Sequence, residues 1–246
     1  MPVPVPDKIK RLKMKYSVVI PLKNEEGNIA ELLSELEPVM QSLNQPWELI
    51  CIDDGSTDST LEILHALSLH RPNMRILSFD RNYGQSSGFD AGFQAAKGEY
   101  VITMDGDLQN DPADIPNLLI VAVHTDLVCG QRVVRRDSLS KRFLSWLGNT
   151  VRSRVCGDGM RDTNCSLKVF RTSCLRKIKM YQGMHRFLPA LFKMEGFTVA
   201  SVAVNHRYRK HGKTKYSLFN RSFNTIADML AVRWMRKRCL KYRIKT

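Results

Sequence analysis

Residues 16–60 read YSVVIPLKNEEGNIAELLSELEPVMQSLNQPWELICIDDGSTDST. An apolar, β-branched strand is followed by an amphipathic helix and then by a second buried strand. The expected elements are strands over 16–22, 47–52, 74–79 and 100–104, and helices over 28–43, from Asp58 onward and over 86–96. Because strand and helix alternate at this rhythm, the sequence predicts an α/β fold with a doubly wound, mostly parallel sheet that is flanked by helices.

Acidic loops follow three of the predicted strands. Glu25 comes after the first strand, Asp53 and Asp54 end the second, and the D-x-D of Asp105 and Asp107 follows the fourth. In sheets of this kind, ligands bind beyond the carboxyl ends of the strands. Carboxylates that meet there repel one another unless they accept hydrogen bonds or bind a cation. The loops therefore predict a site for Mg²⁺ or Mn²⁺, which prefer oxygen ligands and usually accompany substrate phosphates.

Other interpretations of these residues are simpler. Acidic residues at strand ends often form turns and cap helices, and we expect that role for Asp58 and Asp111. Phosphate-binding glycine motifs are not found. No GxGxxG follows the first strand, and Gly212-Lys213-Thr214 is no P-loop because Arg207 stands where that motif has its first glycine.

Charge divides the chain into two unlike halves. Residues 1–130 carry 10 Lys and Arg against 19 Asp and Glu, whereas residues 131–246 carry 28 against 5, so that the net charges are −9 and +23. A basic half is the electrostatic footprint of a nucleic-acid-binding protein, which is a remote alternative here. Few stacking aromatics lie among the cations and the acidic loops would repel a phosphate backbone, so we expect no nucleic-acid partner.

Several further classes are disfavoured. No apolar stretch approaches the roughly 20 residues that span a bilayer, so we expect no transmembrane helix. The start of the chain lacks an apolar core, so we expect a flexible basic leader over 1–14 rather than a signal peptide. The six cysteines form no CxxC pair, and we expect reduced thiols in a cytosolic protein.

The motifs in order resemble family 2 glycosyltransferases of the GT-A fold, and within them most of all the dolichol- or polyprenyl-phosphate mannosyl- or glucosyltransferases. The resemblance covers roughly residues 15–225. It rests on VVIPLKNEEGNI, CIDDGSTDST, RNYGQSSGFDAGFQAAKGEYVITMDGDLQNDP, GQRVVRR, RDTNCSLKVFR and NHRYRKHGKTKYSLFNR. It implies a Rossmann-like GT-A catalytic domain over 15–216.

The resemblance also implies a role for individual residues. The nucleotide pocket would be formed by Pro21, Asn24, Glu25, Asp53, Asp54 and Asp105. The metal ligands would be Asp105, Asp107 and Gln109, and the acceptor phosphate would meet Arg132, Arg142, Arg209 and Lys215. The catalytic set would be Asp107, Arg132, Asp162, Arg209 and Lys215, with Asp162 near the acceptor. Gly106 and Thr214 stand where the family more often has alanine and serine.

The activity implied is an inverting, metal-dependent transfer of a sugar, with mannose or glucose expected first, from a GDP- or UDP-sugar to a polyprenyl or dolichyl phosphate. An acceptor phosphate is already an anion, so that positioning and charge cancellation matter more than a general base. An alternative within the family is another acceptor, such as a cell-envelope glycan or a glycolipid. An inactive scaffold is disfavoured because the D-x-D-x-Q and R-x-x-G-x-T-K-Y motifs are intact.

The last part of the chain, 217–246, is expected to form an amphipathic helix and a basic tail. Its apolar face would comprise Leu218, Phe219, Phe223, Ile226, Met229, Leu230, Val232 and Trp234. Such a helix suits an anionic membrane surface, although it could instead pack on its own domain or bind a membrane partner subunit. We expect a cytoplasmic protein that is peripheral on the cytoplasmic face of a membrane.

Overall fold

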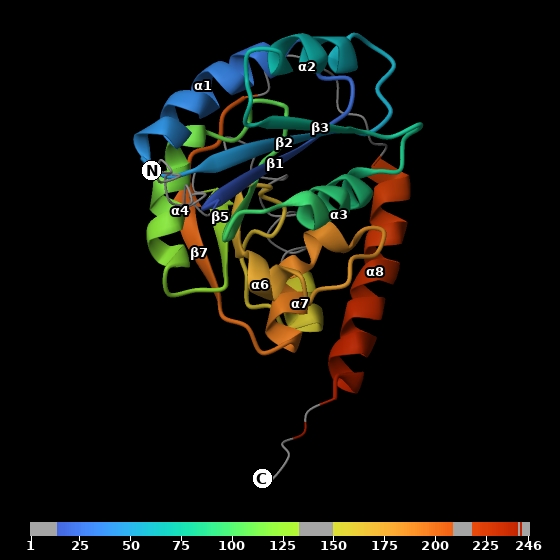
Figure 1. The fold of residues 1–246 in the computed structure, drawn as a ribbon. Coiled ribbons are helices and arrows are strands. Elements are labelled where there is room, and N and C mark those ends of the chain that lie inside the picture. The colour runs from blue at the N-terminus through green and yellow to red at the C-terminus, as the bar shows by residue number, and fades with distance from the viewer. Residues whose placement is uncertain (1–13, 133–149, 209–217, 241, 243–246) are drawn as a thin grey trace, which may run out of the picture.

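The computed structural model describes residues 14–132, 150–208, 218–240 and 242. Within these residues, helices lie on both sides of a central sheet (Figure 1). The strands are β1 (Tyr16–Leu22), β2 (Trp47–Asp53), β3 (Met74–Ser78), β4 (Tyr100–Thr103), β5 (Leu127–Arg132), β6 (Lys168–Arg171) and β7 (Val199–Val204). The helices are α1 (Ile29–Ser42), α2 (Thr60–Ser68), α3 (Gln85–Ala95), α4 (Ile115–Ala122), α6 (Thr172–Leu175), α7 (Leu188–Met194) and α8 (Leu218–Arg238), with the 3-10 turns η1 (Pro112–Asp114) and η2 (Met184–Arg186).

The sheet has the strand order β3-β2-β1-β4-β6-β5-β7. The β1 strand pairs in parallel with β2 and β4, and β2 pairs in parallel with β3, which confirms the predicted α/β alternation. The chain first builds outward from β1 to β3 and then crosses to β4 on the other side. The strand order therefore reverses between β1 and β4, and the loops after these two strands meet at the edge where ligands bind in such sheets.

One strand departs from the parallel arrangement. The β6 strand lies between β4 and β5 and runs antiparallel to both, whereas β5 and β7 are parallel. No strand beyond β4 was predicted from the sequence. The structure adds β5, β6 and β7 to the predicted sheet. The sheet is mostly parallel, as expected, and β6 brings the segment before it back toward the end of β4.

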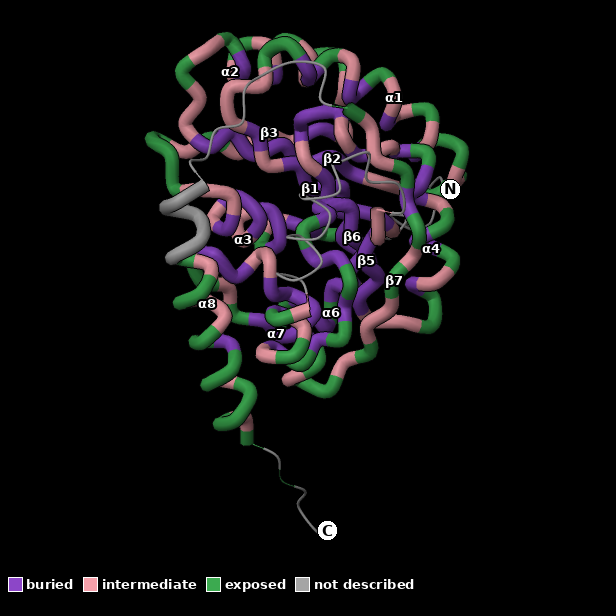
Figure 2. Tube along the Cα trace, turned by 180° about the vertical axis from the view of Figure 1, so that it is seen from behind, coloured by how far each residue is buried: buried purple, intermediate pink, exposed green. Residues whose placement is uncertain are grey.

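Two apolar cores lie on the two faces of the sheet. On one face, side chains of α1, α2 and α4 pack against the strands, including Leu36, Leu64 and Leu118. On the other, Phe89 of α3 packs with residues of α6 and α7 and with Val232 of α8. Figure 2 shows the strands buried between these layers. Burial on both faces accounts for the continuous apolar runs in β1 and β2.

Glycines let α3 approach the sheet closely. A Cβ on Gly88 would lie 3.0 Å from Cβ of Pro21, and one on Gly92 would overlap the side chain of Val19. Only glycine permits this approach without moving a strand. The small residues of this helix thus fix its distance from β1 and β2 and carry its N-terminus to the ligand-binding edge.

The α8 helix packs on the domain along one side only. Val232 is fully buried, whereas Ile226, Leu230 and Trp234 are 52%, 54% and 63% exposed. Of the residues predicted to form an apolar face, Val232 turns toward the domain, whereas Ile226, Leu230 and Trp234 face outward. The side chains of residues 218–223 lie outside the described part. Across the described residues, no helix is both long and apolar enough to cross a membrane.

Candidate active site

The D-x-D loop directly follows β4 and is held by its own polar groups. The backbone N–H of Asp105 donates to Oδ1 of Asn110 at 3.1 Å, and that of Gln109 donates to Oδ1 of Asp107 at 3.1 Å. A Cβ on Gly106 would overlap the end of the Leu22 side chain. The loop therefore packs against the end of β1, and the alanine more frequent at this position would require Leu22 to turn.

Asp105 is held in an environment that disfavours its charge. Burial and the neighbouring charge of Asp107 raise the pKa of Asp105 from its usual 3.8 to about 6. The side-chain amide of Gln85, the first residue of α3, donates to Oδ1 of Asp105 at 2.7 Å. A cation between the two carboxylates would relieve the repulsion that raises this pKa.

The donor set of the loop fits a hard divalent ion. Asp105, Asp107 and Gln109 offer oxygen ligands on one short loop. Among the described residues, no three Asp, Glu, His or Cys side chains gather as a complete metal cage. Mg²⁺ commonly binds through one or two carboxylates together with substrate phosphates and water, so two carboxylates at an open edge are compatible with such an ion.

The loops after β1 and β2 are joined to each other. The backbone N–H of Thr57 donates to Oδ1 of Asn24 at 2.8 Å, and the N–H of Glu25 donates to Oγ1 of Thr60 at 2.8 Å. Asn24 adopts a positive φ of 49°, a conformation that asparagine tolerates better than most residues. These bonds place the loop that contains Pro21, Asn24 and Glu25 beside the end of β2, at the same edge of the sheet.

Asp53 and Asp54 are buried, and their carboxylates accept hydrogen bonds from the end of β3 and from the segment before α3. Oδ2 of Asp53 accepts from the hydroxyl of Ser78 at 3.3 Å. The carboxylate of Asp54 accepts from the backbone N–H groups of Tyr83 at 2.6 Å and Gly84 at 2.9 Å. These bonds tie the end of β2 to the start of α3. The nucleotide-binding roles of both aspartates stay predictions, since these contacts by themselves are structural.

The predicted cap at Asp111 is confirmed, since it is the N-cap of η1, whereas Asp58 lies one residue before Ser59, the N-cap of α2, and forms the turn into that helix. Oδ1 of Asp58 accepts from the backbone N–H of Thr60 at 3.0 Å at the start of α2. Oδ1 of Asp111 accepts from that of Ala113 at 3.0 Å at the start of η1. Both carboxylates thus satisfy N–H groups that a helix start leaves without an intrahelical partner.

Arg132 and Asp162 are brought together by the fold. Nε and Nη2 of Arg132 donate to Oδ2 and Oδ1 of Asp162 at 2.7 and 3.0 Å. Arg132 ends β5, and Asp162 lies in the segment that leads into β6. Two parallel bonds fix the plane of the guanidinium group. The predicted acceptor-side arginine is thus oriented by the predicted acidic residue.

The end of β7 lies against the D-x-D loop. Asn110 and His206 form an isolated antiparallel bridge, and the N–H of Arg207 donates to the carbonyl oxygen of Gln109 at 3.0 Å. The guanidinium group of Arg207 also pairs with Asp111 at 2.8 Å. The predicted residues Arg142, Arg209 and Lys215 lie outside the described residues.

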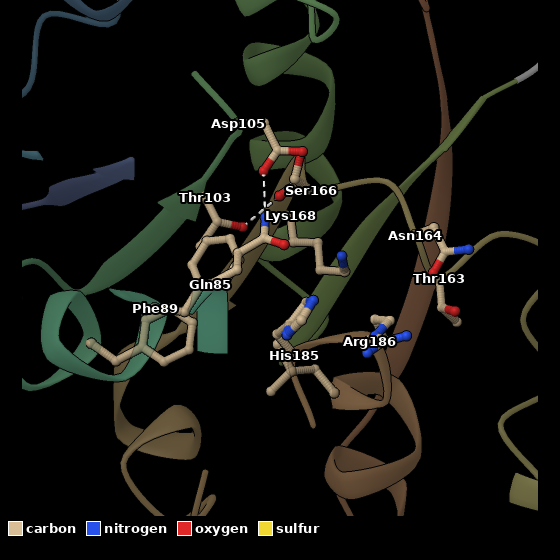
Figure 3. Close-up of a pocket in the computed structure, with 12 residues that line it drawn as sticks. Gln85, Phe89, Thr103, Asp105, Thr163, Asn164, Ser166, Lys168, His185 and Arg186 are labelled. Carbon is tan, nitrogen blue, oxygen red and sulfur yellow. Dashed lines mark hydrogen bonds between the residues drawn. The ribbon is translucent and has the colours of Figure 1, made fainter. Parts of the chain in front are cut away.

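A pocket of ≈ 100 Å³ lies beside Asp105 (Figure 3). Its lining comprises Gln85, Phe89, Phe93, Thr103, Asp105, Thr163, Asn164, Ser166, Lys168, His185, Arg186 and Leu188. Sequence analysis selected only Asp105 from this set. The other residues come from α3, the end of β4, the segment before β6, the start of β6, η2 and α7, and no local motif marks them as neighbours.

All six cysteines are free thiols, as the sequence predicted. Burial raises the pKa of Cys51 and of Cys129 to about 12 and that of Cys156 to about 11. These thiols are therefore protonated and unreactive at neutral pH. They contribute to packing rather than to chemistry.

Comparison with known sequences places the chain in a family. The sequence profile described as Glycosyl transferase family 2 matches residues 17–179. The chain belongs to this family. Dodecaprenyl-phosphate galacturonate synthase of Rhizobium johnstonii is 38% identical over 225 residues, which cover 89% of this chain and 66% of that protein. Undecaprenyl-phosphate 4-deoxy-4-formamido-L-arabinose transferase of Edwardsiella ictaluri is 36% identical over 217 residues, which cover 87% and 66%.

The chain thus spans slightly less than two thirds of the length of these relatives. The names of both relatives describe polyprenyl-phosphate sugar transferases, and the predicted membership is confirmed.

Solved structures show the same fold. Glucosyl-3-phosphoglycerate synthase from Mycobacterium tuberculosis, solved with Mn²⁺, UDP-glucose and phosphoglyceric acid, superposes with a TM-score of 0.67 at 17% identity. The match covers 93% of this chain and 81% of that one. S. aureus TarS superposes with a TM-score of 0.57 at 20% identity, and the match covers 90% of this chain and 66% of that one. The predicted GT-A fold of the family 2 chain is confirmed.

Proposed function

We propose that this family 2 chain is an inverting glycosyltransferase that moves a sugar from a nucleotide-diphosphate donor to a polyprenyl or dolichyl phosphate. The observation that carries the proposal is the meeting of the D-x-D loop with the Asn24 and Asp53 loops at the sheet edge where strand order reverses. The family match and the two polyprenyl-phosphate relatives support the acceptor class. The catalytic domain would comprise residues 15–216.

The donor half of the site would bind the nucleotide diphosphate. Pro21, Asn24 and Glu25, with Asp53 and Asp54, would line the base and ribose pocket. The carrier is UDP or GDP, and the UDP-glucose bound by the M. tuberculosis synthase favours UDP. The two relatives carry, by their names, galacturonate and a formamido-arabinose rather than mannose or glucose, so we propose the wider class of nucleotide-diphosphate sugars.

A divalent ion, Mg²⁺ or Mn²⁺, would be held by Asp105, Asp107 and Gln109. When bound, it would neutralise the charge that develops on the leaving nucleotide diphosphate. The M. tuberculosis synthase was solved with Mn²⁺, which supports the choice of ion. Asp105, with a pKa raised to about 6, is ionised at neutral pH and ready to bind it.

The acceptor half would use the basic second half of the chain. Arg132, oriented by Asp162, would bind an oxygen of the acceptor phosphate, with Arg142, Arg209 and Lys215 as further cations. An arginine held in one plane binds phosphate oxygens with little loss of side-chain freedom. The acceptor oxygen would attack the anomeric carbon from the side opposite the leaving diphosphate, which gives inversion.

The α8 helix and the tail, residues 217–246, would rest on an anionic membrane surface, on its cytoplasmic face. The outward apolar side chains Ile226, Leu230 and Trp234 follow one another at four-residue spacing. Arg233 and Lys237 lie on the exposed side of the same helix. Apolar side chains flanked by cations suit the interface of an anionic bilayer, where each cation adds about 1 kcal/mol.

One transfer experiment tests the proposal. The purified chain is incubated with undecaprenyl phosphate and a panel of radiolabelled UDP- and GDP-sugars, with and without EDTA, and label in the lipid phase is counted. We expect label from at least one donor, its loss in EDTA and its return with excess Mn²⁺ or Mg²⁺. Asp107→Asn should reduce the rate on the order of a hundredfold or more, whereas the exposed-site control Asp80→Asn should not. Absence of label from every donor would contradict the proposal.

A further inference from the structure

The pocket beside Asp105 lies where the sugar of a diphosphate donor would be. A diphosphate bound at the D-x-D loop would carry its sugar on the glycosidic oxygen of the β-phosphate, and so would place the sugar next to the metal-binding carboxylates. The rings of Phe89 and Phe93 from α3 and the side chain of Leu188 from α7 form an apolar side of this pocket. Aromatic and aliphatic side chains pack well against the C–H face of a sugar ring. The pocket therefore combines the right place with a surface suited to a sugar.

Basic side chains outnumber acidic ones around this pocket. Among the described residues, Lys168 from β6 and His185 and Arg186 from η2 line it, and Asp105 is the acidic side chain of the lining. Figure 3 shows Lys168, His185 and Arg186 around the space below Asp105 in that view. Because Asp105 belongs to the proposed metal pair and Asp228 lies 3.8 Å from Arg186, Lys168 is the cation of this lining that is best placed to meet a charged group on the donor sugar.

Lys168 is held inside the pocket wall. Its side chain is 5% exposed, and its ammonium group donates to the carbonyl oxygen of Cys165. A buried cation is costly unless an anion or several acceptors compensate it. Asp105 supplies part of that compensation, since the charge of Lys168 acts on its carboxylate; when a metal ion takes up the charge of Asp105, a ligand anion in the pocket would compensate Lys168 instead.

His185 is oriented by a buried serine. The N–H of Gly183 donates to Oγ of Ser86 at 3.0 Å, and that oxygen lies 2.6 Å from Nδ1 of His185. We assign the single hydroxyl proton of Ser86 to Nδ1, because the hydroxyl already accepts from Gly183. A neutral imidazole ring then carries its own proton on Nε2, which makes Nε2 a hydrogen-bond donor.

Arg186 is anchored from the opposite side. Its Nη1 donates to Oγ1 of Thr225 at 2.6 Å, and its Nη2 lies 3.8 Å from Oδ2 of Asp228, both on α8. The guanidinium group is thus partly neutralised by Asp228 and contributes less charge to the pocket than Lys168. It mainly fixes η2, and with it His185.

A buried hydroxyl in the same wall points to a ligand independently. Thr163 is fully buried, and within the described residues its Oγ1 has no hydrogen-bond partner. A buried polar group left in this state destabilises the fold. A ligand oxygen in the pocket, which Thr163 lines, would satisfy it.

We propose that this pocket binds the donor sugar and that the sugar is a uronic acid, with its carboxylate recognised by Lys168 and by Nε2 of His185. This inference rests on the proposed function. In the transfer, the bond from the anomeric carbon to the diphosphate oxygen breaks with its electron pair on the diphosphate, and a new bond forms to the acceptor phosphate oxygen. The carboxylate is unchanged. The acceptor phosphate is the other anion that could occupy this pocket. Arg132, which we propose as its ligand, does not line the pocket.

Paired donors that differ in one group test the sugar class. UDP-galacturonate and UDP-galactose, UDP-glucuronate and UDP-glucose, and GDP-mannuronate and GDP-mannose differ only in a carboxylate against a hydroxymethyl group. We expect the preferred acidic donor to exceed its neutral partner by about a hundredfold in kcat/KM. Equal or faster transfer of the neutral sugar would overturn this inference and leave the proposed function standing. Transfer from none of the six would also overturn this inference, whereas the proposed function is contradicted only when every donor of the wider panel fails.

Binding without acceptor identifies the residues. Equilibrium dialysis of the preferred acidic donor and its neutral partner is compared for the wild type, His185→Gln and Thr163→Val. We expect His185→Gln to lose about tenfold in preference for the acidic donor, with affinity for the neutral donor little changed, and Thr163→Val to weaken the binding of both donors by similar factors. His124→Gln, at an exposed histidine, is the matched control. If undecaprenyl phosphate instead binds about tenfold more weakly to these variants while the donor preference is unchanged, the pocket holds the acceptor phosphate and the inference is wrong.

Discussion

Arg132 and Asp162 stand thirty residues apart in the sequence and face each other through two hydrogen bonds of 2.7 and 3.0 Å. Asp162 is 5% exposed and Arg132 18%. The charge of Asp162 and its hydrogen bonds outweigh the effect of burial and raise the pKa of Arg132. Arg132 therefore keeps its charge, and the two hydrogen bonds to Asp162 fix its orientation.

Replacing Asp162 by Asn should release Arg132. Asparagine offers one acceptor oxygen and no charge, so that the second bond to the guanidinium group and the orientation it gives are lost. We expect kcat to fall about ten- to a hundredfold, with donor affinity unchanged, and the free energy of unfolding to fall by about 1–3 kcal/mol. Steady-state kinetics with varied acceptor and thermal melts provide the measurement. Arg132→Lys, which keeps the charge without the planar fork, should lose a similar factor in kcat, and full activity of both variants would contradict the role.

Replacing Asp105 by Asn should stabilise the metal-free protein at high pH. The folded-state pKa of Asp105, about 6, lies above its usual 3.8, so its ionised form destabilises the fold above pH 6. Asn keeps the oxygen that accepts from Gln85 and removes the charge. In EDTA at pH 8 we expect a gain of up to about 3 kcal/mol, which shrinks from pH 6 to pH 4 as the wild-type carboxyl takes up its proton. Chemical denaturation across this pH range measures it.

The exposed carboxylate Asp80 provides the matched control for that experiment. Asp80→Asn makes the same change of functional group at an exposed position, and its stability is measured in parallel over the same pH range. A pH-independent difference for Asp105→Asn would contradict the assignment of a raised pKa to Asp105.

The outward side chains of α8 should control membrane binding. Leu230→Gln with Trp234→Gln removes two exposed apolar groups without touching buried Val232. We expect partition into phosphatidylglycerol-containing vesicles to fall by at least about tenfold, and added salt to weaken wild-type binding further. Co-sedimentation measures it. Leu69→Gln, at a residue that is 81% exposed at the end of α2, is the control, and unchanged sedimentation of the double variant would rule out this face.

Thiol reactivity should separate Cys239 from the other five cysteines. Cys239 is half-buried, whereas Cys51, Cys129, Cys156, Cys165 and Cys174 are buried. Burial raises the pKa of each of these five thiols, which keeps them protonated at pH 8. With an aromatic disulfide reagent we expect one fast equivalent in the folded protein and six in denaturant, and Cys239→Ser should remove the fast one. Several fast equivalents in the folded wild type would contradict the described burial.

Short sequence patterns predicted the structural features that depend on residues close together along the chain. The strands β1 to β4 and the helices between them were readable because each carries its own apolar period and turn residues. The D-x-D loop was recognisable because both carboxylates are two residues apart and directly follow a strand. Asp58 and Asp111 each accept a hydrogen bond from the backbone N–H two residues further along the chain, so that these local roles were predictable too.

The pocket beside Asp105 was not predictable in this way. Gln85, Thr163, Lys168 and His185 come from four separate segments, and they meet because β6 returns antiparallel beside β4 while η2 packs against the start of α3. Likewise, the composition of α8 offers apolar residues around much of the helix, and contact with α7 and η2 selects which of them are buried.

The sequence by itself thus determined the α/β alternation, the family and the acidic edge of the site, since these follow from backbone periodicity and from residues close along the chain. Only the tertiary structure decided that Asp162 orients Arg132, that Ser86 holds His185, and that Val232 faces inward while Trp234 faces out. Each of these depends on which distant segments the packing of the two cores brings within hydrogen-bond or van der Waals distance, and no local pattern encodes that distance.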